Sequence, residues 1–299
     1  MRLENIKQVA VIGAGNMGSG IAELLSRVGG YHVIMSDTSN ELVQRGLQNQ
    51  RNNLQRFFVD KRKITAGEME EILGRIKITT NNTEATSKAD FVIEAAFERM
   101  EVKKSIFRQL DEATPPHTLL VTNTSGLSVT EIASQTKRPD KVSGMHFFNP
   151  PAVMKLVEVV KGALTSEETA NTVNELAKKL GKETIFCRDT YLFLANRAAG
   201  STGNLNEAVD LLWTHIATPE DIDKAVRLGF NWPMGPLERG DLIGAWGVIA
   251  DSEAERVREL GWERGHVHPL IKMMARAGYT GGLGKKGIYD FWKDSLSKW

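Results

Sequence analysis

The chain has 299 residues, of which 41% are hydrophobic and 25% charged, as in a soluble globular protein with room for two domains. Its formal net charge of +1 excludes a broad electrostatic surface for nucleic acid or for an anionic membrane. No apolar run approaches a bilayer-spanning length, the N-terminus has no signal-peptide core, and the single cysteine, Cys187, excludes an intrachain disulfide. We therefore expect a cytoplasmic protein that has neither nucleic acid nor a membrane as its partner.

The first part of the chain alternates predicted strands and helices. Strands are expected at residues 8–13, 32–37, 75–80, 90–96, 118–125, 142–148, 154–160 and 183–189. This alternation predicts an α/β domain over about residues 1–188, with a doubly wound, Rossmann-type parallel sheet and helices on both faces. A helical pair at about residues 40–73, with a capping box at Thr65–Glu68, is too long for a simple crossover. It predicts an inserted hairpin that projects from the sheet.

Only helical patterns follow after about Asp189. Thr218 and Pro219 form a typical helix start, because proline in the first turn loses no hydrogen bond. Residues 189–299 therefore predict a smaller, all-helical domain. Its apolar helical faces exceed what one small domain can bury, which favours a homodimer through this domain.

A glycine-rich loop joins the first predicted strand to the first predicted helix. The pattern Gly13-x-Gly15-x-x-Gly18 suits a tight turn, a close approach of backbone to pyrophosphate, and close packing of helix on sheet. Asp37 ends the second strand 19 positions after Gly18, where a carboxylate binds the adenosine ribose and repels a 2′-phosphate. These features predict NAD, in preference to NADP, bound by the loop residues Gly13, Gly15, Asn16, Met17 and Gly18 together with Asp37. The alternative is an ordinary strand–helix turn that binds nothing.

The stretch "SGMHFFNPPAVMKLVEVVKG" sets one histidine and one glutamate among apolar residues. In a strand, Leu156, Glu158 and Val160 share one face, and a carboxylate among aliphatic side chains is costly unless it is paired. His146 is a candidate partner, and the pair has either a structural or a catalytic role.

Together with "NTSGLS", "ANR" and "WPMGPLE", that stretch resembles the L-3-hydroxyacyl-CoA dehydrogenase family from about Ile6 to Asp290. Within the family it is most similar to the monofunctional 3-hydroxybutyryl-CoA dehydrogenases. The resemblance implies reversible oxidation of an (S)-3-hydroxyacyl-CoA thioester to a 3-ketoacyl-CoA with NAD. It also implies an active site in the cleft between the two domains, and a homodimer.

The resemblance assigns roles residue by residue. His146 becomes the general acid/base and Glu158 the carboxylate that orients it, while Ser125 and Asn196 bind the reacting oxygen or the thioester carbonyl. Further positions that match the family lie beside the cofactor or the histidine: Glu98, Lys103, Asn123 and Asn149. The basic residues Arg56 and Lys61, at the turn of the inserted hairpin, are candidates for docking the phosphates of coenzyme A.

Each assignment has a structural alternative: a satisfied core histidine, a serine that caps a turn, an asparagine on a helix surface, and a solvated basic helix end. Residues 198–204, "AAGSTGN", are small and polar where relatives carry bulky apolar residues, which affects the fit of the substrate. The other histidines show no metal-ligand spacing, so no metal is expected. The rival functions are a dehydrogenase of a free hydroxy acid, such as carnitine or gulonate, and a non-catalytic NAD-binding relative.

Overall fold

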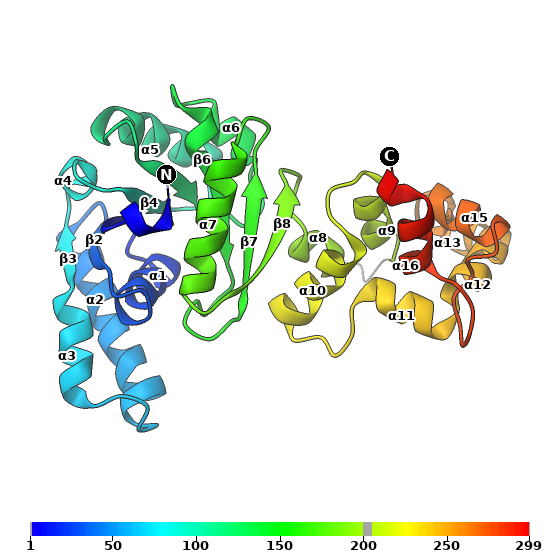
Figure 1. The fold of residues 1–299 in the computed structure, drawn as a ribbon, viewed down its shortest axis with the longest axis horizontal. Coiled ribbons are helices and arrows are strands. Elements are labelled where there is room, and N and C mark those ends of the chain that lie inside the picture. The colour runs from blue at the N-terminus through cyan, green and yellow to red at the C-terminus, as the bar shows by residue number, and fades with distance from the viewer. Residues whose placement is uncertain (1, 200–204, 299) are drawn as a thin grey trace. The chain divides into compact units, whose positions relative to one another are not determined.

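The computed structural model describes residues 2–199 and 205–298 of the chain. It has two compact units, Met1–Tyr191 and Leu192–Trp299 (Figure 1). The first unit contains every strand of the sheet, and the second consists of helices and their connections. Within the described part of the chain, no helix has the length and apolar character needed to cross a membrane.

The first unit is built on one eight-stranded sheet, in the order β3-β2-β1-β4-β5-β6-β7-β8. Its strands are β1 Gln8–Ile12, β2 His32–Ser36, β3 Ile76–Thr79, β4 Phe91–Glu94, β5 Leu119–Thr122, β6 Val142–Phe147, β7 Leu156–Lys161 and β8 Glu183–Arg188. The central strands β1, β4 and β5 are buried along almost their whole length, because helices cover the sheet on both faces. The α/β, Rossmann-type fold class predicted from the sequence is confirmed.

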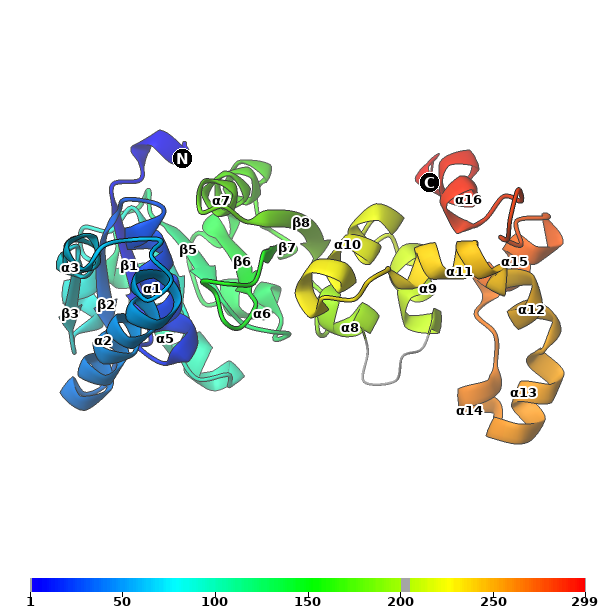
Figure 2. The same ribbon diagram turned by 90° about the horizontal axis from the view of Figure 1, so that it is seen from below.

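The helices of this unit are η1 Leu3–Asn5, α1 Asn16–Arg27, α2 Asn40–Leu54, η2 Gln55–Val59, α3 Ala66–Gly74, α4 Asn82–Thr86, α5 Met100–Ala113, α6 Val129–Ala133, η3 Pro139–Lys141 and α7 Glu167–Lys179. Apolar residues of α1 and α7 share one buried core with one face of the sheet. The short helices α4 and α6 also contact the sheet, and Figure 2 shows α6 and α7 on opposite sides of β6 and β7. The sequence pattern does not predict α4 or α6, because each helix is only five residues long.

The insertion at about residues 40–73 consists of α2, the π-helical segment η2, and α3. These helices enclose a small core of their own, formed by Leu54, Met69, Ile72 and Leu73. The Thr65–Glu68 capping box opens α3, with the Thr65 amide donating to Glu68 Oε2 at 2.7 Å. The hairpin therefore has its own hydrophobic support and does not depend on the sheet alone.

One connection differs from the predicted parallel sheet: β6 and β7 pair antiparallel. The reason is the connection, residues 148–155, which contains no helix. Parallel neighbours need a crossover of a dozen or more residues, whereas a short loop can only reverse the chain. Strands β7 and β8 are parallel to each other and therefore run opposite to the rest of the sheet.

The second unit contains α8 Ala195–Ala199, α9 Leu205–Trp213, α10 Pro219–Phe230, α11 Pro236–Ile243, α12 Ala245–Asp251, α13 Glu253–Leu260, α14 Trp262–Gly265, α15 Pro269–Arg276, α16 Ile288–Asp294 and η4 Leu296–Lys298. Thr218 caps α10 with Pro219 in the first turn, as predicted. Of the polar segment 198–204, the last five residues lie outside the described part of the chain.

A buried carboxylate explains the glycine of "WPMGPLE". Asp223 of α10 is fully buried and accepts hydrogen bonds from the backbone N–H groups of Leu237 and Glu238, at 2.9 and 2.7 Å, and from the hydroxyl of Tyr289. A Cβ at Gly235 would lie 2.3 Å from the Asp223 carboxylate. Burial raises the pKa of Asp223, against these hydrogen bonds. This motif therefore joins α10, α11 and α16.

Candidate active site

The three glycines of the loop after β1 have different surroundings. A Cβ on Gly13, whose φ is +106°, would lie 2.5 Å from the Ala95 carbonyl oxygen, and one on Gly18 would lie 1.9 Å from the Gly13 carbonyl oxygen. Both glycines are therefore required by the turn and by the packing of α1. Gly15 precedes α1 and has nothing within 4 Å of the position of its Cβ. Its missing side chain leaves room for a ligand at the start of the helix, where N–H groups favour an anion.

Asp37 lies beside the same loop. Its Oδ2 accepts a hydrogen bond from the Ala14 N–H, and its Oδ1 accepts one from the Thr38 N–H, both at 2.7 Å. A cavity of about 810 Å³ adjoins Gly13 and Asp37 and extends between residues 80–83 and α5. A helix N-terminus for the pyrophosphate, a carboxylate for the ribose and a large adjoining cavity fit a bound dinucleotide. Asn16 and Met17 begin α1, directly after the glycine loop.

His146 and Glu158 meet across the antiparallel pair. They are register partners on β6 and β7, and His146 Nδ1 lies 2.6 Å from Glu158 Oε2. Both side chains are buried, and the imidazole also packs against the ring of Phe148 at a centroid distance of 4.5 Å. An ionised carboxylate only accepts hydrogen bonds, so this contact places a hydrogen on Nδ1 of the ring. Glu158 therefore sets both the tautomer and the orientation of the imidazole.

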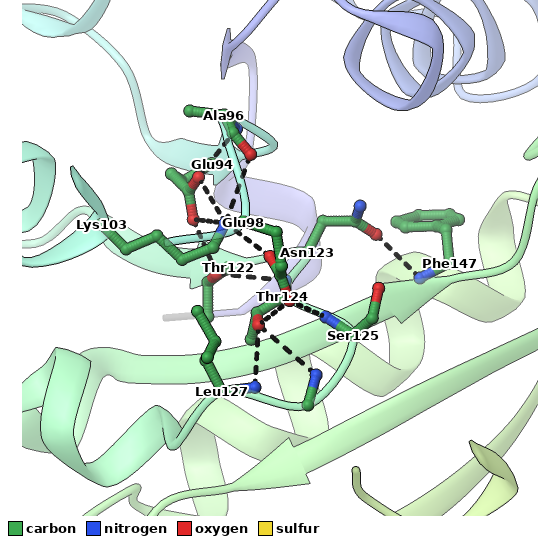
Figure 3. Close-up of polar contacts among 11 residues, drawn as sticks. Glu94, Ala96, Glu98, Lys103, Thr122, Asn123, Thr124, Ser125, Leu127 and Phe147 are labelled. Atoms are coloured by element: carbon green, nitrogen blue, oxygen red, sulfur yellow. Dashed lines mark hydrogen bonds and ion pairs between the residues drawn. The ribbon is translucent and has the colours of Figure 1, made fainter. Parts of the chain in front are cut away.

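Ser125 lies on the loop after β5, and a carboxylate holds the backbone of that loop. Glu98 Oε1 accepts hydrogen bonds from the Ser125 N–H at 2.7 Å and from the Thr124 hydroxyl at 2.6 Å (Figure 3). A second carboxylate, Asp189, holds the far end of the loop by accepting from the Ser128 hydroxyl at 2.7 Å. Ser125 itself is exposed. The loop therefore presents this serine from a backbone that is fixed on both sides.

Lys103, which the sequence assigns to the cofactor, is buried in an ion-pair network. Its ammonium donates to both oxygens of Glu94 at 2.8 and 3.0 Å and lies 3.2 Å from Glu98 Oε2 (Figure 3). Glu94 was not among the residues predicted from the sequence. Its signal was available, because "FVIEAA" sets one carboxylate in an apolar strand, as "KLVEVV" does for Glu158.

The two asparagines lie near the strand that carries His146. Asn123 Oδ1 accepts a hydrogen bond from the Phe147 N–H at 2.9 Å and so ties the end of β5 to the end of β6. Asn149 follows β6 and lines a second cavity of about 360 Å³, which also borders α1 and the hairpin helix α2.

Lys182 holds the loop that carries Asn149. Its buried ammonium donates to the carbonyl oxygens of Pro151 and Met154. Burial, and secondarily Arg27, lower the pKa of Lys182 to about 8, against the attraction of Glu23. Lys182, which was not predicted as a site residue from the sequence, therefore holds the loop after β6 in place.

The remaining predicted residues belong to the hairpin and to the second unit. Arg56 and Lys61 are exposed on η2 and on the turn after it, and the guanidinium of Arg56 lies 5.3 Å from the ring centroid of Phe57. Asn196 lies on α8 of the second unit, where the neighbouring Arg197 pairs with Glu207 at 2.9 Å. Among the described residues, no group of three or more histidine, cysteine or acidic side chains is arranged to hold a metal ion.

Family models match both units of the chain. Residues 8–190 match the family model for the NAD binding domain of 3-hydroxyacyl-CoA dehydrogenase, and residues 193–291 match its C-terminal domain. A probable 3-hydroxybutyryl-CoA dehydrogenase of Bacillus subtilis is 42% identical over 286 residues, covering 96% of this chain and 98% of that relative.

Two further proteins are similar over most of the chain. The 3-hydroxyadipyl-CoA dehydrogenase of Escherichia coli is 43% identical, covering 96% of this chain but 59% of that relative. The crystal structure of an (S)-3-hydroxybutyryl-CoA dehydrogenase from Ralstonia eutropha superposes with a TM-score of 0.65 at 35% identity, covering 95% of this chain and 99% of the other. The matches over both units confirm the predicted resemblance: the chain belongs to the 3-hydroxyacyl-CoA dehydrogenase family and is an NAD-dependent oxidoreductase.

Proposed function

We propose that this enzyme interconverts (S)-3-hydroxyacyl-CoA and 3-ketoacyl-CoA, that its preferred substrate is the short-chain 3-hydroxybutyryl-CoA, and that His146 and Glu158 are its acid–base pair. The observation that carries the proposal is the buried contact of 2.6 Å between His146 Nδ1 and Glu158 Oε2. A carboxylate that holds one nitrogen of an imidazole directs the other nitrogen to proton transfer. The names of the relatives at about 42% identity support the acyl group.

In the oxidation direction, His146 Nε2 takes the proton of the C3 hydroxyl while the C3 hydrogen leaves with its electron pair as a hydride. The C3–O bond then becomes a carbonyl. NAD held by the glycine loop and Asp37 would supply the hydride acceptor. As His146 takes the proton it becomes positively charged, and the ionised Glu158 compensates that charge at hydrogen-bond distance. In the reduction direction, His146 returns the proton to the same oxygen.

Ser125 and Asn196 bind the C3 oxygen or the thioester carbonyl, with the Ser125 hydroxyl and the Asn196 amide as donors. Support for Ser125 comes from its exposure on a loop whose backbone is held by Glu98 and Asp189. Asn123 fixes the strand end next to His146 by accepting from Phe147 N–H, so its contribution is to place β6. Glu98 and Lys103 are the acid and the base beside the bound cofactor.

The coenzyme A moiety lies along the hairpin. The cavity beside Asn149 is lined by asparagine side chains of α1 and α2, which can bond the amides of a pantetheine arm. Arg56 and Lys61 lie further along the same hairpin, exposed and positively charged, where phosphates can reach them. This arrangement favours a CoA thioester over a free hydroxy acid, which has no use for either feature.

The second unit supports a homodimer. Leu242, Ile243 and Val248, from α11 and α12, are 62%, 62% and 70% exposed, and such a cluster is typical of an interface. Light scattering of the protein and of Ile243→Glu measures the mass directly. A dimer that Ile243→Glu dissociates supports the proposal, and a monomeric parent protein refutes it.

The single cysteine fits a reducing, cytoplasmic compartment.

The decisive experiment is NADH oxidation with acetoacetyl-CoA, run in parallel with NADPH and with free acetoacetate. We expect fast turnover only with NADH and the thioester. Turnover with free acetoacetate alone would move the protein to the hydroxy-acid branch, and no turnover with intact NADH binding would indicate a non-catalytic relative. Because one relative is named for 3-hydroxyadipyl-CoA, that substrate is compared with 3-hydroxybutyryl-CoA in the oxidation direction.

A further inference from the structure

Glu94 is a fully buried carboxylate with no role in the mechanism above. It ends β4, and both of its oxygens are engaged. Oε1 accepts from the Ala96 N–H at 2.7 Å and from Lys103 at 2.8 Å, while Oε2 accepts from the Thr122 hydroxyl at 2.7 Å and from Lys103 at 3.0 Å. A charge removed from water in this way costs free energy unless its partners are well placed. The four hydrogen bonds from these three groups supply that compensation.

The ammonium of Lys103 is shared between two carboxylates. Its side chain is 1% exposed and lies on α5, between Glu94 and Glu98 (Figure 3). Its remaining contact is the Ala96 carbonyl oxygen at 3.5 Å. Lys103 has three N–H groups, and these contacts occupy them. Lys103 is therefore held in place by Glu94 and in turn fixes Oε2 of Glu98.

The other oxygen of Glu98 carries the connection to the substrate loop. Oε1 accepts from the Ser125 N–H at 2.7 Å and from the Thr124 hydroxyl at 2.6 Å. One continuous chain of charged hydrogen bonds and one ion pair thus runs from Glu94 through Lys103 and Glu98 to the backbone of Ser125. It joins β4, α5 and the loop after β5, all at the carboxyl ends of the strands.

We propose that Glu94 is a positioning residue for the reaction: through Lys103 and Glu98 it fixes the backbone of Ser125, and so the direction of the Ser125 hydroxyl. The inference rests on the proposed function, because that function gives Ser125 its substrate. A purely structural Glu94 would stabilise the end of the sheet and leave Ser125 unaffected. The two roles differ in their effect on the loop and on catalysis in the folded enzyme.

The test is Glu94→Gln, which keeps the shape of the side chain but turns one acceptor into a donor that cannot bond Lys103. Glu94→Gln is expected to lower kcat/KM for acetoacetyl-CoA by about 10- to 100-fold, since small misplacements of a reacting group are costly. Because Glu98 and Lys103 are also assigned to the cofactor, affinity for NADH is measured by fluorescence and is expected to fall by much less than kcat/KM; an equal loss in both would assign the effect to the cofactor and overturn the role through Ser125. The matched control is Asp111→Asn. Asp111 lies on α5, the helix that also carries Lys103, and forms a largely buried ion pair with Arg138, which the substitution breaks.

Two further measurements separate positioning from stability. Glu94→Gln combined with Glu98→Gln should be no worse than the more severe single variant, because both act through one chain of contacts. Additive losses would overturn the proposal. The double variant Glu94→Gln, Lys103→Met removes both buried charges; it is expected to regain thermal stability and to keep the catalytic defect. Recovery of full activity with stability would assign Glu94 a structural role.

Hydrogen exchange reports on the loop without any substrate. The amide of Ser125 is expected to exchange at least about tenfold faster in Glu94→Gln than in the parent protein, and Asp111→Asn should leave it unchanged. An unchanged rate in Glu94→Gln overturns the positioning role even if the enzyme's substrate is different. Absence of turnover by the parent protein would refute the proposed function instead, so the two failures are distinguishable.

Discussion

Glu158→Gln is the sharpest test of the proposed acid–base pair. The substitution keeps the size of the side chain and one acceptor oxygen for the Nδ1 hydrogen of His146, but it removes the charge. We therefore expect the fold to persist while catalysis suffers. The contact is direct, at 2.6 Å between Nδ1 and Oε2, and both side chains are buried, so solvent cannot replace the lost charge.

The expected loss follows from two contributions. Exchanging a charge-assisted hydrogen bond for a neutral one costs about 1–2 kcal/mol. The attraction between the carboxylate and an imidazolium near 4 Å adds up to about 4 kcal/mol at an effective dielectric constant near 20. A net loss of about 2–4 kcal/mol corresponds to a decrease in kcat of about 30- to 1,000-fold. This lies within the contribution of about 10²–10⁴ that general acid–base catalysis makes.

The assay is steady-state NADH oxidation with acetoacetyl-CoA at several pH values, with urea unfolding of the same samples. Asp111→Asn serves as the control, because it also changes a largely buried, cation-paired carboxylate to an amide, on α5. We expect that control to lose stability without losing kcat. A Glu158→Gln enzyme that retains kcat within about threefold of the parent would refute the dyad, and Glu158 would then serve only to fill the core.

The remaining predictions concern cofactor, substrate and pH. Asp37→Ser is expected to lower kcat/KM for NADH by about tenfold and to raise it for NADPH, measured with both cofactors; unchanged selectivity would contradict its role at the ribose. Arg56→Ala with Lys61→Ala is expected to raise KM for acetoacetyl-CoA by about 2- to 30-fold, with no change for acetoacetyl-N-acetylcysteamine, which lacks the phosphates; equal effects on both would exclude phosphate docking. The pKa of Lys182 is about 8 in the folded protein, below its ordinary value of 10.5, so burial of its charged form weakens the fold at low pH. As pH rises from about 8 to 10.5, the free energy of unfolding of the parent protein should increase relative to that of Lys182→Met, measured by urea titration. If the difference in free energy between the two proteins stays constant with pH, the lowered pKa of Lys182 is contradicted.

Much of the fold could be predicted because local patterns and global architecture agree. The apolar runs that end in glycine or a polar residue became parallel strands, and the Thr65–Glu68 and Thr218–Pro219 signals mark true helix starts. The direction of β7 could not be read in the same way. Periodicity shows which face a residue occupies and not which way a strand runs, so only the helix-free connection 148–155 reveals the reversal.

The candidate site shows the same division. The glycine pattern and Asp37 lie within one strand–loop–helix–strand stretch, so their spacing along the chain already specifies their geometry. Glu94 escaped notice because its partners, Lys103 and Thr122, come from two other elements. A carboxylate in an apolar strand signals that a partner exists, but not which residue it is.

The sequence by itself determined the fold class and the glycine-rich loop, because these depend on residue type and short-range spacing, and its resemblance to the family pointed to the residues that we propose for proton transfer. Only the tertiary structure decided which of them meet. The antiparallel register brings His146 opposite Glu158, and the crossing of β4, α5 and the β5 loop assembles the chain from Glu94 to Ser125. The physical reason is that a hydrogen bond acts over about 3 Å, whereas the residues that form these bonds are separated along the chain by loops and helices whose path no local pattern specifies.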